Sequence, residues 1–140
     1  MQPEVKVRVL EDQRAVYGDH EMRLLEAIAR RGTLSDGANA LGLSYRSAWG
    51  KIKAMEAALG TRLVESTVGG SGGGSSRLTE PAQRLLARYV RFRTALGEYA
   101  QQEFERCFGF ETVGHPQTPA KGPAPSVIEN GVSMGAEERV

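Results

Sequence analysis

The chain has 140 residues, 40% of them apolar and 25% charged, which suits one ordinary domain and is too apolar for full disorder. Lys and Arg number 18 against 17 Asp and Glu, so the formal net charge of +1 lacks the fixed basic bias of a histone-like protein. The single cysteine, Cys107, excludes an internal disulfide or a cysteine zinc site, and the lack of a signal peptide or of a ~18-residue apolar run predicts a cytoplasmic protein without a membrane partner.

The first predicted elements are a strand and a helix. Three valines alternate with basic residues over 5–9, which is the two-residue period of a half-buried strand. Gly18 then marks a break between the strand and the next element, and we expect Asp19 to cap a helix. Apolar residues follow at helical spacing until two arginines and Gly32, a typical helix exit.

A short second helix is predicted next. Thr33 or Ser35 can cap it, and it runs through Leu41 with Ala38 and Leu41 facing inward. Gly42 ends it, so that a short turn leads into the next helix.

A third helix is predicted from its N-cap Ser44 to Leu59, and Gly60 stops it. At ~100° per residue, four apolar side chains share the expected core face: Ala48, Ile52, Met55 and Leu59. Trp49 and Gly50 lie on the other side, where an exposed aromatic and a helix-interior glycine both carry a cost. Any amphipathic surface helix shows such a split, but these two residues favour a contact surface.

This basic helix has a width that fits the major groove of DNA. We expect DNA contacts from Ser44, Tyr45, Arg46, Ser47, Trp49, Gly50, Lys51 and Lys53. Arg46 can pair bidentately with guanine, whereas Lys51 and Lys53 are better placed to contact phosphates.

Two short strands, predicted at 62–65 and 76–79, flank the glycine-rich sequence TVGGSGGGSS. A phosphate-binding loop is disfavoured because Ser75 stands where its lysine is needed, and a flexible linker is the other alternative. A hairpin wing explains the placement better, because glycines let the backbone approach DNA closely. We expect this wing to contact DNA through Gly70, Ser71, Gly72, Gly73 and Arg77.

A long fourth helix is predicted from its cap, Thr79, to about Cys107. Apolar residues recur along it at alternating spacings of three and four, as in a heptad seam. The same stripe can pack on its own domain, but a small core covers only part of so long a helix, which favours a homodimer. The predicted dimer interface is Leu85, Tyr89, Phe92, Leu96 and Tyr99.

The order of these elements predicts a mainly α fold with a small β-sheet, a winged helix-turn-helix. The predicted organisation has four parts: an N-terminal strand and lead-in (1–18), the winged helix-turn-helix (19–80), a dimerisation helix (81–110) and a disordered tail (111–140). The tail has a net charge of −2 and residues 1–110 a net charge of +3, so the near-neutral total hides a basic folded part.

The sequence from Arg23 to Tyr89 resembles the N-terminal DNA-binding domain of the ModE family of molybdenum-responsive regulators, which is related to the LysR-type winged helix. The SYRSAW and TVGGSGGGSSRLT segments carry the resemblance. It implies a cytoplasmic, homodimeric regulator with its recognition helix at 44–53 and its wing at 69–77. Full-length members carry molybdate-binding domains after this one. The Pro- and Gly-rich tail cannot form such a domain, so we expect a stand-alone member that has no cofactor.

The function favoured by these observations is a sequence-specific regulator that binds double-stranded DNA, and the resemblance implies molybdenum-related or metabolic genes as its targets. The alternative is a protein-interaction adaptor on the same scaffold, with Trp49 at its centre. His20 and His115, the two histidines, lie at a helix start and in the tail, so neither suggests a catalytic pair or a metal site.

Overall fold

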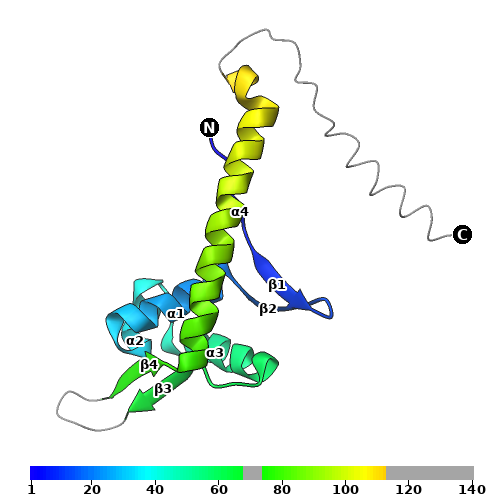
Figure 1. Cartoon of the computed structure of the whole chain (residues 1–140). Helices are drawn as coiled ribbons and strands as arrows, with labels where there is room; N and C mark the ends of the chain where they lie inside the picture. Colours follow the sequence, from blue (N-terminus) through cyan, green and yellow to red (C-terminus); the bar gives the residue numbers. More distant parts are fainter. Residues whose placement is uncertain (68–73, 113–140) are drawn as a thin grey trace, which may run out of the picture. The chain divides into compact units, whose positions relative to one another are not determined.

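The computed structural model describes residues 1–67 and 74–112 of the chain (Figure 1). The chain divides into two units, residues 4–99 and residues 1–3 with 100–140. The described elements, in order, are β1 (Arg8–Glu11), β2 (Arg14–Gly18), α1 (Asp19–Arg31), α2 (Leu34–Ala40), α3 (Tyr45–Leu59), β3 (Val64–Thr67), β4 (Ser75–Leu78) and α4 (Glu80–Thr112). β1 pairs with β2, and β3 with β4, each pair antiparallel. The predicted winged helix-turn-helix fold is therefore confirmed.

The N-terminal part differs from the prediction of a single strand over 5–9. It is a hairpin whose strands are joined by a two-residue turn at Asp12 and Gln13. Both turn residues have positive φ, 51° and 67°, as this tight turn requires. Asp12 is a residue that such turns favour, but Gln13 stands where a glycine usually follows, so the local signal for this turn is weak.

Asp19 does not cap α1 as expected. Gly18 occupies the N-cap position, and no side chain there bonds the first turn. The Asp19 carboxylate instead accepts hydrogen bonds from the Val7 N–H (3.0 Å), from Nε of Arg93 (3.0 Å) and from the Tyr89 hydroxyl. It thereby links the start of α1 both to the segment before β1 and to α4.

The remaining helix ends that the structure describes here have the caps that the sequence predicts. The Thr33 hydroxyl accepts a hydrogen bond from the backbone N–H of Asp36 (2.9 Å), and the Ser44 hydroxyl accepts one from that of Ser47 (3.0 Å). These hydroxyls therefore cap α2 and α3. Gly32 and Gly60 close α1 and α3 with φ of 89° and 70°, the left-handed conformation that glycine adopts without strain.

The core gathers the apolar faces of α1 and α3 with the wing strands and the first turns of α4. Its side chains include Leu24, Leu25, Ile28, Ala48, Ile52, Met55, Leu63, Leu78 and Ala82. Two inward predictions were wrong, since Leu41 and Leu59 are both 37% exposed. Leu59 is the last residue of α3, and Leu41 directly follows the last residue of α2.

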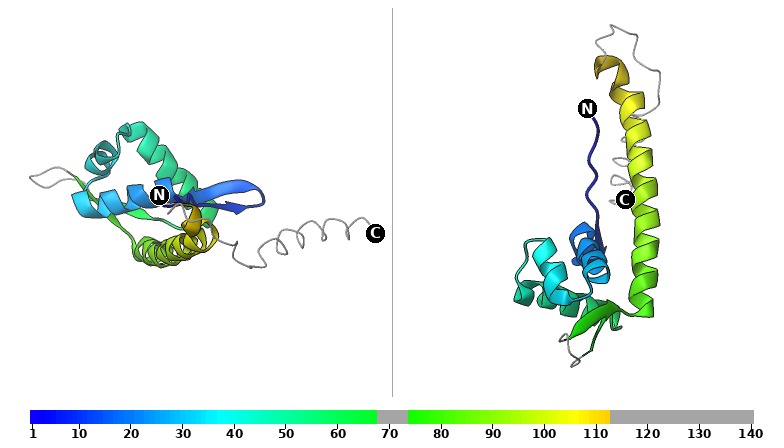
Figure 2. Two further views of the ribbon diagram at one scale, coloured as in Figure 1. Left: turned by 90° about the horizontal axis from the view of Figure 1, so that it is seen from above. Right: turned by 90° about the vertical axis from the view of Figure 1, so that its left-hand side faces the viewer.

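Helix α1 lies between α4 on one side and α2 on the other, as both views in Figure 2 show. The α1–α2 contact is close enough to need a glycine. A Cβ atom on Gly37 would lie 2.9 Å from Cγ1 of Ile28 and 3.0 Å from its backbone nitrogen. This glycine in the middle of a short helix is therefore a packing residue.

Helix α4 starts after Thr79, as predicted, and continues past the expected end near Cys107 to Thr112. The predicted disordered tail lies almost wholly outside the described residues, which end at 112. In the parts of the chain that are described, no helix has the length and apolar character needed to cross a membrane.

Candidate nucleic-acid interface

The helix-turn-helix consists of α2, a four-residue turn and α3. The turn closes because the backbone N–H groups of Leu41 and Leu43 donate to the carbonyl of Ala38, at 3.0 and 2.9 Å. Gly42 makes the bend with φ of 72°. The Ser44 cap then fixes where α3 begins, so the local sequence sets the direction of the helix.

The predicted contact residues at the start of α3 lie on its solvent side. Tyr45 and Trp49 are 56% and 47% exposed, and Ser44, Arg46, Ser47 and Gly50 are exposed as well. No atom lies within 4 Å of a Cβ built on Gly50, so its own domain does not require a glycine there. This face has a cation, two aromatic rings and a small residue, and it buries little within the domain.

Both lysines predicted to contact phosphates already have interactions within the domain. Nζ of Lys53 lies 3.1 Å from a Glu56 carboxylate oxygen and 5.0 Å from the centre of the Trp49 ring. Nζ of Lys51 lies 4.0 Å from a carboxylate oxygen of Glu21 on α1. Arg46 has no ion pair among the described residues. It is therefore the cation on α3 that is most available to a ligand.

Glu56 is a residue whose role the sequence did not reveal. Its buried carboxylate accepts hydrogen bonds from the backbone N–H groups of Leu63 (2.8 Å) and Val64 (3.3 Å). Burial acts to raise the pKa of Glu56, but the hydrogen bonds from Leu63, Lys53 and Val64 outweigh it and hold the pKa below its ordinary value. The charged carboxylate thus joins α3 to the strand that starts the wing.

The wing hairpin is also attached to the turn between α1 and α2. The Ser76 N–H donates to the carbonyl of Gly32 (2.8 Å), and its hydroxyl accepts from the N–H of Leu34 (3.2 Å). Arg77 is exposed on β4, with Nε 3.5 Å from a carboxylate oxygen of Glu65 across the hairpin. The loop residues predicted to contact DNA, Gly70, Ser71, Gly72 and Gly73, lie outside the described residues.

The residues predicted for the dimer interface fall into two groups. Leu85 and Tyr89 pack against the core of their own domain, with Tyr89 only 7% exposed, as the alternative interpretation of the stripe states. Phe92 and Tyr99 are 52% and 61% exposed, and Leu96 is half-buried. Only this second group presents apolar surface that the domain leaves uncovered.

Comparison with known proteins agrees with this geometry. Residues 20–83 match the family of bacterial regulatory helix-turn-helix proteins of the lysR family. The chain is 42% identical over 79 residues to the molybdenum-pterin-binding protein MopA of Rhodobacter capsulatus. The matched region covers 56% of this chain and 30% of MopA. It is 38% identical over 89 residues to the DNA-binding transcriptional dual regulator ModE of Escherichia coli K12, covering 64% of this chain and 34% of ModE. The chain thus spans about a third of the length of these relatives.

Among solved structures, the fold is similar to that of full-length CbnR complexed with its target DNA. The TM-score is 0.51 at 22% identity, and the match covers 64% of this chain and 30% of that one. The resemblance of the N-terminal part to ModE regulators is confirmed by the sequence matches. Residues 20–83 are therefore a helix-turn-helix domain of the bacterial regulatory LysR type.

Proposed function

We propose that this domain is the DNA-binding part of a transcriptional regulator and that α3 reads base edges in the major groove. The observation that carries the proposal is the exposed face of α3, where Arg46, Trp49 and Gly50 contribute little to the packing of their own domain. Arg46 supplies the bidentate donor that pairs with guanine, and the uncovered Gly50 allows the backbone to approach a groove wall. Tyr45 and Ser47 contact the flanking phosphates or base edges.

The wing contributes the second contact. Arg77 and the glycine-rich loop bind the backbone or the minor groove next to the segment that α3 reads. Because Glu56 and Ser76 attach the wing to α3 and to the α1–α2 turn, both contacts are held in one fixed geometry.

The regulator acts as a homodimer through the exposed part of α4, around Phe92 and Tyr99. A two-fold dimer places its two recognition helices ~34 Å apart or at a multiple of that distance, which requires a palindromic site. The similarity to ModE and MopA makes genes of molybdenum metabolism the first targets to examine.

The test begins with selection of bound fragments from sheared genomic DNA, followed by titration of one selected duplex. We expect Kd to rise steeply with salt and Arg46→Ala to weaken binding by about 1–3 kcal/mol while relaxing specificity at one base pair. The matched control is Arg30→Ala, which removes an exposed arginine on α1 that already pairs with Glu26. Unchanged binding by Arg46→Ala would disprove the assigned readout.

Repeating the titration with molybdate tests whether this chain responds to it.

A protein-interaction adaptor is the second candidate, and the exposure of Trp49 favours it. The two functions differ in their salt dependence. If no genomic fragment is retained at low salt while Trp49→Ala abolishes capture of a protein partner, the adaptor function is correct.

A further inference from the structure

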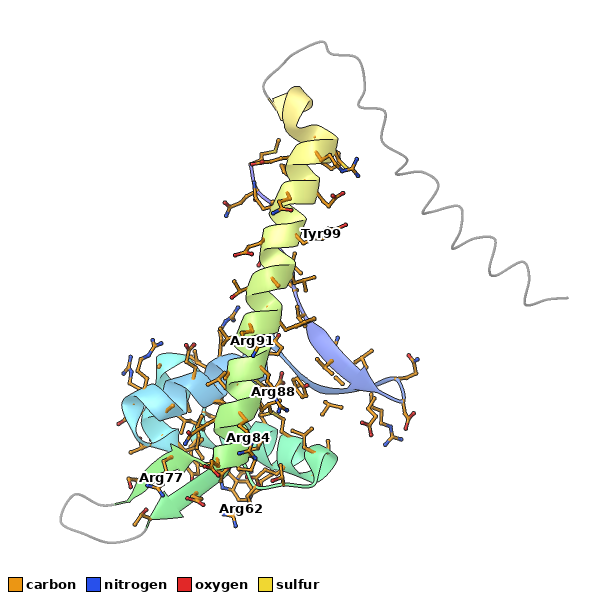
Figure 3. All side chains as sticks on the ribbon, viewed as in Figure 1. Arg62, Arg77, Arg84, Arg88, Arg91 and Tyr99 are labelled. Atoms are coloured by element: carbon orange, nitrogen blue, oxygen red, sulfur yellow. The ribbon has the colours of Figure 1, made fainter. Side chains whose placement is uncertain are left out.

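Helix α4 carries a row of exposed arginines that the sequence analysis did not single out. Arg84, Arg88 and Arg91 are spaced four and three residues apart, so they lie within ~60° of one another on one face. Figure 3 shows them following one another along α4. Arg62 stands at the base of this row, because its carbonyl accepts a hydrogen bond (2.7 Å) from the hydroxyl of Thr79, the residue before α4. We call Arg62, Arg84, Arg88 and Arg91 the arginine stripe.

The charge of the stripe is poorly neutralised within the domain. Arg84 lies 3.7 Å from a carboxylate oxygen of Glu80, and both side chains are mostly exposed, so solvent screens this pair. Among the described residues, Arg88 and Arg91 have no ion pair, and Arg62 donates only to the carbonyl of Val64 (3.4 Å). Like charges four residues apart destabilise a helix. The arrangement therefore favours an anionic partner.

We propose that the arginine stripe binds the phosphate backbone of duplex DNA outside the segment that α3 contacts. Arg84 to Arg91 spans seven residues, or ~10 Å of helix, and over that axial length one DNA strand presents about three to four phosphates at ~3.4 Å of axial rise each. Every cation in the stripe is an arginine, whose planar fork binds phosphate with two parallel hydrogen bonds. This inference rests on the proposed function, since it extends the same DNA contact.

The stripe is connected to the candidate interface. Only Gly60 and Thr61 separate Arg62 from the end of α3, and Arg62 shares a shallow depression with Lys53. A lipid surface fits less well. A helix that lies on a bilayer presents a continuous apolar face to it, but Ala82 and Tyr89, opposite the stripe, are buried in the domain core, and the exposed Phe92 and Tyr99 are assigned to the proposed dimer contact.

The experiment compares two duplexes that carry the same selected site. One duplex covers the site alone, and the other is extended by about one helical turn, ~10 base pairs, on each side. Kd is measured for the wild-type chain and for the double variant Arg88→Ala with Arg91→Ala over a series of salt concentrations. The control variant, Arg8→Ala with Arg14→Ala, removes the same charge from exposed positions of the β1–β2 hairpin.

On the extended duplex, the stripe variant should reduce the slope of log K against log salt by about two, because each lost phosphate contact contributes ~0.9. The change in its Kd between about 50 and 200 mM salt is then ~10-fold smaller than for the wild type. The short duplex and the control variant should show little difference. Replacement by lysine at both positions should largely restore the slope, since lysine keeps the charge.

Equal slopes for the wild type and the stripe variant on the extended duplex would overturn the stripe contact and leave the proposed function intact. Weaker binding by Arg46→Ala, together with an unchanged slope for the stripe variant, would support the proposed function alone. Absence of duplex binding by the wild-type chain would remove both proposals. Binding to anionic vesicles that depends on Arg88 and Arg91, without any change in DNA affinity, would assign the stripe to lipid instead.

Discussion

The carboxylate of Glu56, near the end of α3, accepts a hydrogen bond of 2.8 Å from the backbone N–H of Leu63, just before β3. One buried side chain thus sets the position of the wing relative to the helix that we propose to read DNA. The neighbouring N–H of Val64 donates to the same oxygen at 3.3 Å. Removal of the carboxylate would leave both backbone donors buried and without this acceptor.

We therefore expect Glu56→Ala to lower the free energy of unfolding by about 2–4 kcal/mol, since each buried unsatisfied donor costs ~1–3 kcal/mol. Glu56→Gln should cost less, because its amide oxygen can still accept one of the bonds. Urea unfolding followed by circular dichroism measures both variants. A Glu56→Ala variant within about 0.5 kcal/mol of the wild type would show that the wing is held by other contacts.

The acid sensitivity of the fold should follow from two carboxylates. Burial acts to raise the pKa values of Asp19 and Glu56, but hydrogen bonds outweigh it and hold them below their ordinary values of 3.8 and 4.5. Groups with lowered folded pKa values stabilise the fold fully above the unfolded pKa, and this stabilisation is lost as the pH falls through the folded pKa. Unfolding free energy should thus decrease below about pH 4.5.

Urea titrations between about pH 6 and pH 3 would measure this loss. In Glu56→Gln, where one of the two groups no longer titrates, the decrease should be shallower than in the wild type. An identical pH profile for both proteins would mean that the stabilisation by Glu56 does not depend on its charge.

Gly37 and Gly50 offer a matched pair of substitutions in helices. Alanine at Gly37 would place a Cβ 2.9 Å from Cγ1 of Ile28 and 3.0 Å from its backbone nitrogen, so we expect destabilisation by about 1–3 kcal/mol. Alanine at Gly50 meets nothing within 4 Å and should stabilise the domain by about 0.5–1 kcal/mol through helix propensity.

The proposed function adds a second expectation for Gly50→Ala, namely weaker DNA binding by the more stable protein. Thermal unfolding and duplex titration of the same preparation separate the two effects. If Gly50→Ala binds DNA as the wild type does, the groove wall does not approach the backbone at this position.

The proposed dimer can be tested at the exposed residues of α4. Phe92→Asp combined with Tyr99→Asp should convert a dimer into a monomer, because a charge in an apolar contact has to be desolvated. Val90→Asp is the control, since Val90 is 49% exposed on another side of the same helix. Sedimentation equilibrium measures the mass. A wild-type monomer, or a double variant that remains a dimer, would rule out this interface.

The sequence was sufficient for features that depend on a few neighbouring residues. The ends of α1 and α3 could be placed from Gly32, Ser44 and Gly60, because caps form within one turn of the chain. The exposed side of α3 followed from its period, and Arg46 and Trp49 lie where that period puts them. The arginine row on α4 was visible in the same way, as a spacing of four and three. The predicted role of this helix, however, rested on its seam of apolar residues alone.

Only the tertiary structure could decide which groups bond across the chain. Asp19 looked like a helix cap, but its partner Tyr89 lies 70 residues further on. Tyr89 belonged to a continuous apolar stripe, yet it is buried in the domain while Phe92, three residues later, is exposed. The pattern of a helix states which side chains share a face, whereas the neighbours packed against that face determine how far along the helix it is covered.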